Sequence, residues 1–163
     1  MKPLLHWPGI LALAAALAGM PAGAADPPVA DSADADAVSR TAAVDATRAT
    51  DLWLAAIDTG RFADSWKDAA EVFKLGVTQD EWISDLTTMR GQLGQTKMRE
   101  LKSAQYSTRL RGAPATGQYV TVTYLTKFAN ALLAVETVVV SKEGDGEWRI
   151  AGYRIGNVHA EEQ

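Results

Sequence analysis

The chain has 163 residues, 16 Lys and Arg against 20 Asp and Glu, and no cysteine. Its net charge of −4 provides no basic footprint for nucleic acid, and without a thiol it holds no disulfide, redox couple or lipid-modified cysteine. The length suits one domain of ordinary size, which its hydrophobic core alone must stabilise.

The N-terminus has the three parts of a secretory signal peptide. Lys2 supplies the positive region, residues 9–20 are apolar, and Ala22-Gly23-Ala24 forms a small-residue cleavage site. The apolar run is shorter than the roughly 20 residues of a spanning helix, which disfavours an uncleaved anchor. We therefore expect residues 1–25 to be removed, leaving a periplasmic protein of the bacterial envelope, with no lipid anchor and no transmembrane segment.

Residues 26–40 read DPPVADSADADAVSR and contain only Val29 and Val38 as large apolar residues. Such a segment cannot bury enough surface to offset its chain entropy. We expect a disordered tether over 26–40 rather than an acidic metal site, then one folded domain over 41–158 and a polar tail over 159–163.

Three helices are predicted at the start of this domain. The first, within residues 42–60, carries apolar residues at helical spacing: Ala49, Leu52, Trp53, Ala56 and Ile57. The second, over residues 61–76, places on one side Phe62, Trp66, Ala69 or Ala70, and Phe73.

The third helix has the clearest start signal. Thr78 and Glu81 have the spacing of a capping box, and Val77 and Trp82 that of a hydrophobic staple. Its buried stripe is predicted to contain Trp82, Leu86, Met89 and Leu93, before Gly94 ends it.

After Gly94 the apolar period changes to that of strands, at residues 98–110, 118–128, 131–142 and 147–155. Within 118–128, Val120, Val122, Tyr124 and Phe128 share one face. Helices followed by hairpins predict an α+β fold in which three helices pack on an antiparallel sheet of about four strands.

Several segments resemble a family of short exported bacterial proteins known as domain of unknown function 4019. They are WLAAIDTGRFADSW, TQDEW, LKSAQY, GQYVTVTYLTKFAN, AVETV and EWRIAGYRI, within about residues 44–157. The topology is also similar, more loosely, to the cone-shaped nuclear-transport-factor-like fold, which implies a curved sheet and a pocket. The family implies no established activity.

The sequence lacks the parts of most catalytic centres. After the signal peptide it has one histidine, His159, in the polar tail, so no Ser-His or Cys-His system and no zinc cluster is predicted. No phosphate-binding glycine loop occurs. We expect no metal and no cofactor.

A group of basic residues surrounds the first predicted strand: Lys97, Arg99, Lys102, Arg109 and Arg111. They could dock an anionic partner such as a phospholipid head group. The favoured interpretation is that they protect an exposed edge strand from pairing with a neighbour.

Glu136 interrupts the apolar run ALLAVETVVV. Neither face of this strand is plainly polar, so we expect a central strand in a sheet covered on both faces, with Glu136 turned toward the helices beside Tyr124. The length of the hairpin loop at residues 143–147 decides its neighbour. Arg154 would make Glu136 a paired structural acid, whereas Tyr153 or Ile155 would leave a desolvated acid, the usual mark of a functional site.

Three functional hypotheses follow. The first is non-enzymatic binding of a small apolar or amphipathic ligand, or of a protein partner, in the cone or on the sheet; Trp66, Tyr124, Phe128 and Glu136 would line the site. The second is an acid/base enzyme that uses Glu136 with Tyr124. The third is a structural homodimer that packs through its sheet.

Overall fold

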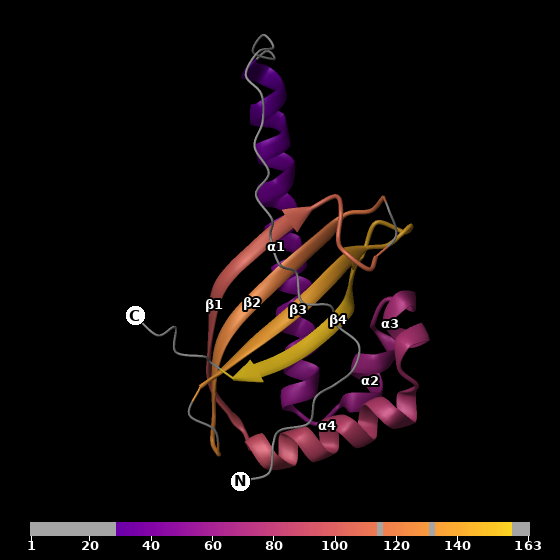
Figure 1. The fold of residues 1–163 in the computed structure, drawn as a ribbon, viewed down its shortest axis with the longest axis vertical. Coiled ribbons are helices and arrows are strands. Elements are labelled where there is room, and N and C mark those ends of the chain that lie inside the picture. The colour runs from indigo at the N-terminus through magenta and orange to yellow at the C-terminus, as the bar shows by residue number, and fades with distance from the viewer. Residues whose placement is uncertain (1–28, 114–115, 131–132, 158–163) are drawn as a thin grey trace.

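The computed structural model describes residues 29–113, 116–130 and 133–157 (Figure 1). The elements in chain order are α1 (Val29–Asp58), α2 (Phe62–Lys67), α3 (Glu71–Gly76), α4 (Gln79–Leu93), β1 (Thr96–Ser107), β2 (Tyr119–Phe128), β3 (Ala134–Lys142) and β4 (Trp148–Asn157). The strands form one antiparallel sheet in the order β1-β2-β3-β4. The predicted α+β class, with helices before the sheet, is confirmed. The predicted signal peptide and polar tail lie outside the described residues.

The segment predicted as a disordered tether is helical from Val29 onward. Alanine is the best helix former, and the alanines of residues 29–40 let α1 begin well before the domain does. This end of α1 extends past the sheet (Figure 1), and the side chains of residues 33–38 are exposed. Across the described residues, no helix is long and apolar enough to cross a membrane.

The buried face of α1 is rotated from the predicted one. Leu52 is 70% exposed, whereas Leu54 is completely buried. The buried side chains that α1 shares with the prediction are Trp53, Ala56 and Ile57. The stripe shifts because α1 also packs Thr50 and Ala46 inward, and small residues give a weak signal in an apolar pattern.

The second predicted helix is divided into α2 and α3. Between them Ala70 is extended, with φ −63° and ψ 156°, and its N–H donates to the carbonyl oxygen of Ile150 at 2.9 Å. The backbone therefore bonds to the edge of β4 instead of continuing the helix. A tertiary hydrogen bond of this kind is invisible to helical periodicity.

The predicted start of α4 is confirmed. The Thr78 side chain accepts from the Glu81 N–H, and the Glu81 carboxylate accepts from the Thr78 N–H at 3.0 Å. Trp82 and Leu86 are buried as predicted, and Gly94, with φ 75°, ends the helix.

A bulge in β4 sets the register at Glu136. The hairpin has a three-residue loop, closed by a hydrogen bond from the Glu143 N–H to the Glu147 carbonyl, and this loop alone would pair Glu136 with Arg154. Val140 pairs with Ile150 but Val139 pairs with Gly152, so one extra residue enters β4 there. Glu136 consequently faces Ile155.

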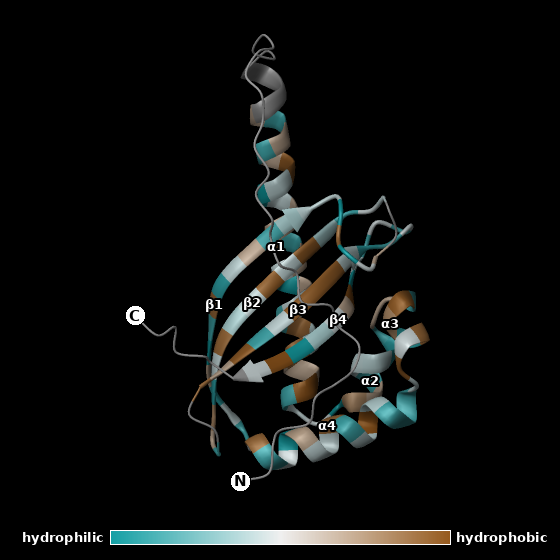
Figure 2. Cartoon of the chain, in the orientation of Figure 1, coloured by the Kyte–Doolittle hydropathy of each residue, from teal (hydrophilic) through white to brown (hydrophobic). Residues whose placement is uncertain are grey.

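The helices cover one face of the sheet, which we call the inner face. α1 passes across it (Figure 1), and the core between them contains Trp53, Leu54, Ile57, Trp82, Leu86, Val120, Val122, Tyr124, Val138, Val140 and Ile150. Hydrophobic residues gather on β2 and β3, whereas the edge strand β1 is largely hydrophilic (Figure 2). No described helix packs on the opposite, outer face, so within this chain the sheet is covered on one face, and a cover of the outer face by a partner subunit stays a prediction.

Candidate functional site

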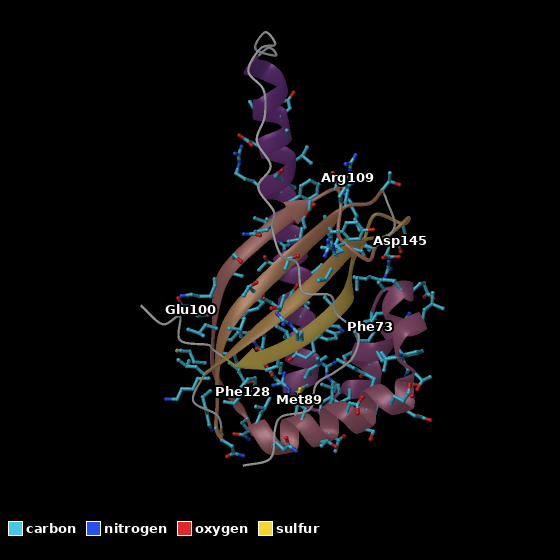
Figure 3. The ribbon with its side chains drawn as sticks, viewed as in Figure 1. Phe73, Met89, Glu100, Arg109, Phe128 and Asp145 are labelled. Atoms are coloured by element: carbon cyan, nitrogen blue, oxygen red, sulfur yellow. The ribbon has the colours of Figure 1, made fainter. Side chains whose placement is uncertain are left out.

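Glu136 lies on the inner face as predicted. It pairs across the sheet with Tyr124, and neither is open to solvent, with Glu136 at 0% and Tyr124 at 3% exposure. The acid sits near the end of the sheet where Phe128 lies, which Figure 3 labels together with Met89 of α4. A charge so deeply buried must be paired and hydrogen-bonded.

Both oxygens of the Glu136 carboxylate are occupied. Oε2 accepts from Arg99 Nε at 2.7 Å and from the Thr126 hydroxyl. Oε1 accepts from the Tyr153 hydroxyl at 2.6 Å and from Arg99 Nη2 at 3.3 Å. Arg90 Nη2 approaches Oε1 at 3.5 Å. Donors from α4, β1, β2 and β4 therefore converge on one carboxylate of β3.

Asp58, the last residue of α1, joins the same arginines from the other side. Arg99 Nη1 lies 2.6 Å from Asp58 Oδ2, and Arg90 Nη1 lies 3.1 Å from Oδ1. Thr96 donates to Oδ1 at 2.8 Å. A carboxylate at a helix C-terminus is unfavourable beside the helix dipole, and the two cations compensate for it. We call Glu136, Arg99, Asp58 and Arg90 the inner network; its two positive and two negative charges balance.

The network shifts the pKa of Asp58, Arg99 and the adjoining Tyr153. Burial acts against the charged forms of Asp58 and Arg99, but their mutual hydrogen bonds prevail, lowering the pKa of Asp58 and raising that of Arg99. Burial, reinforced by the charge of Glu136, raises the pKa of Tyr153 well above its ordinary value. These three shifts hold Asp58 and Arg99 charged and Tyr153 neutral at neutral pH.

This geometry suits a structural role better than proton transfer. A general base needs a free lone pair within reach of a substrate. Glu136 has no exposed surface, and five donors from four side chains already surround its oxygens. The acid/base hypothesis therefore finds no accessible base at this position.

The other predicted site residues each have a partner within the fold. The Tyr124 hydroxyl donates to Asp51 Oδ1 at 2.7 Å, and burial followed by this bond raises the pKa of Tyr124. The Phe128 ring lies 5.1 Å from the Arg90 guanidinium. Trp66 lies apart, donating to the Val77 carbonyl at 2.9 Å. Their role as ligand contacts stays a prediction.

Sequence reasoning missed three of the four network residues. Arg99 was assigned to the protection of an edge strand, because two register irregularities in β1 hide which of its side chains turn inward. Arg90 follows Met89 on the buried side of α4, and Asp58 directly follows Ile57 of α1. A charged residue next to the apolar stripe of a helix was the available signal that these side chains turn toward the core.

A second region lies on the outer face, at the opposite end of the sheet. It is a hollow of about 380 Å³ where the β1–β2 connection and the β3–β4 hairpin meet. Figure 3 labels Arg109 and Asp145, which belong to these two connections. Its lining includes Val72, Leu110, Arg111, Gly112, Ala113, Gly117, Tyr119, Val139, Lys142, Glu143, Gly144, Ala151 and Gly152. None of the four predicted ligand contacts is among its lining residues.

The chain folds closely over one side of this hollow. Tyr119 is only 6% exposed although its position is on the outer face. A Cβ at position 117 would lie 2.5 Å from the Tyr119 hydroxyl oxygen, so a larger residue there would displace the Tyr119 ring. On the other side, the bulge places Ala151 and Gly152 on the wall. Among the residues that the structure describes, no group of His, Cys, Asp or Glu could hold a metal.

The comparisons with known proteins identify a family but no activity. No curated protein and no solved structure matches the chain. The family described as "Protein of unknown function (DUF4019)" matches residues 49–153. The matched range contains the whole inner network and ends at Tyr153. The chain therefore belongs to the DUF4019 family.

Proposed function

We propose that this chain is a non-enzymatic binding module of the bacterial periplasm, and that its ligand site is the hollow on the outer face of the sheet. The observation that carries the proposal is the lining of this hollow, where apolar side chains and glycine backbone remain uncovered. The inner network, in contrast, has satisfied its charges internally.

The dimensions of the hollow support a small ligand. Its volume of about 380 Å³ falls within the roughly 300–1,000 Å³ of small-molecule sites. Val72, Leu110 and Val139 supply apolar contact, while Thr116 and Gln118 add polar groups that can orient a ligand. This mixture of mainly apolar surface with a few polar groups is typical of such sites.

The strands that form part of the lining indicate a site that exists before the ligand binds. Val139 and Gly152 belong to paired strands, and they are directly opposite each other in the sheet. Tyr119, the first residue of β2, is buried, and its ring lies close to the backbone of Gly117 in the connection. A site built on strands keeps its geometry better than one built on loops alone.

Native mass spectrometry of protein purified from the periplasm tests the proposal. We expect a co-purifying small molecule that Val139→Arg displaces, since the long side chain would fill the floor of the hollow. Val135→Arg is the matched control: it makes the same change on the same face of the same strand, away from the hollow. Protein without an adduct, or an adduct that survives Val139→Arg, would contradict the site.

A structural homodimer is the second candidate, favoured by the uncovered outer face. Leu125 and Val135, which are neighbours on it, are only partly buried. Four strands about 4.8 Å apart and about 30 Å long offer about 600 Å² per copy, near the lower limit of a stable interface. The partner would be a second copy of this chain. The same spectra decide, because a dimer would be broken by Val135→Arg and would carry no adduct.

A further inference from the structure

We infer that the ligand of the hollow is an amphipathic anion, with an apolar body and a carboxylate or phosphate head. This inference rests on the proposed function and names the chemistry of the same site. It follows from the two cations, Arg111 and Lys142, that line the hollow together with its apolar side chains.

These cations are available to a ligand. Both side chains are exposed, and neither has a carboxylate partner among the described residues. Lys142 instead lies 5.8 Å from the centre of the Trp148 ring. In a chain of net charge −4, two unpaired cations beside one hollow form a local site for negative charge.

The acidic groups nearby have their own partners. Glu143, the one acid of the lining, accepts from the Ser141 hydroxyl at 2.6 Å. Asp145, in the adjacent loop, makes two hydrogen bonds to Arg149, which hold the pKa of Asp145 at about 2. Arg149 is therefore neutralised, and the lining keeps two positive charges against one negative.

The apolar part of the ligand has a path beyond the hollow. Val72 is 47% exposed and lines the hollow, and Leu75, one turn further along α3, is 88% exposed. Residues three apart lie on the same side of a helix. An acyl chain too long for the hollow could therefore continue from Val72 over Leu75.

The test is a titration of the isotope-labelled protein, followed through the backbone amide signals of Gly112, Gly117, Gly144 and Gly152. Decanoate has both proposed parts, decanol has the same chain without the charge, and inorganic phosphate has the charge without the chain. Decyl phosphate distinguishes a phosphate head from a carboxylate. We expect one of the two amphipathic anions to bind about tenfold more tightly than decanol, and phosphate to produce little change.

Variants distinguish the existence of the binding site from its preference for an anion. Arg111→Gln with Lys142→Gln should reduce the affinity for the anion to that for decanol, and leave decanol binding unchanged. Lys97→Gln, an exposed lysine of β1 outside the hollow, is the control. Equal binding of decanol and the anions would overturn the inference and leave the binding site intact. Phosphate binding as tight as the anions would also overturn it. Absence of all binding would refute the site itself.

Discussion

The inner network and the hollow occupy opposite faces and opposite ends of the same sheet, and they treat charge in opposite ways. In the network, two arginines and two carboxylates are directed at one another, and Glu136 at its centre is fully buried. At the hollow, two cations are exposed and have no acidic partner in the described part of the chain. The difference teaches that the most conspicuous charge of the sequence, Glu136, is paired within the fold, while the inconspicuous loop end leaves its cations exposed, and there we place the proposed ligand site.

The largest expected effect comes from Glu136→Gln, which would break the network while preserving shape. Arg99 and Arg90 would lose a buried counter-charge, and we expect the free energy of unfolding to fall by about 3 kcal/mol. Urea denaturation measures it.

Glu100→Gln is the matched control, because Glu100 pairs with Lys102 at 2.9 Å at the surface, where both side chains are about half exposed. Exposed pairs contribute about 0–1 kcal/mol. Equal losses in the two variants would show that the inner network is not special.

Tyr153→Phe should cost about 1–2 kcal/mol at neutral pH, because Glu136 and Arg90 each lose a hydrogen bond to the hydroxyl. The raised pKa of Tyr153 also makes a pH prediction. The stability that the protonated Tyr153 hydroxyl provides is complete below pH 10.0, the pKa of tyrosine in the unfolded chain. It is lost as the pH rises from there toward the higher pKa of Tyr153 in the folded protein. Between pH 9 and 11, the free energy of unfolding should therefore fall less steeply with pH in Tyr153→Phe than in the unchanged protein. An identical fall in both proteins would argue against this linkage.

Thr78→Ala serves as a reference for the size of these stability losses, since Thr78 lies outside both the inner network and the hollow. It removes the acceptor of the Glu81 N–H, and we expect a loss of about 1 kcal/mol. Val77→Ala should cost less. A thermal unfolding series that shows no change for Thr78→Ala would mean that the capping box does not stabilise α4.

The smallest effect is expected at the hollow. Lys142→Gln should change the free energy of unfolding by less than about 0.5 kcal/mol, because its side chain is exposed and has no ion pair. A clear loss of stability would remove the contrast between the two regions and assign Lys142 a structural role through Trp148.

The sequence predicts the class of the fold because its signals are local. Helical and strand periods, the Thr78 capping box and the loop at residues 143–147 each depend on neighbouring residues. The inner network depends instead on residues from α1, α4 and β1, placed by bulges that leave no clear local pattern. The alternation of β3 placed Glu136 beside Tyr124 correctly, but nothing local pointed to Arg99 and Arg90 as its partners. The hollow was not predicted, because it forms where two connections meet.

The bulge in β4 also predicts where length changes are tolerated. Residues on both sides of Ala151 already have consecutive partners in β3, namely Val140 for Ile150 and Val139 for Gly152. A chain that lacks Ala151 would keep every one of these pairings, whereas losing one residue between Tyr153 and Ile155 would exchange inward and outward side chains beyond it. The strand β4 can therefore lose one residue, Ala151, without a change in its register with β3. An alignment of related sequences should place its gap at Ala151, and not in the hairpin loop.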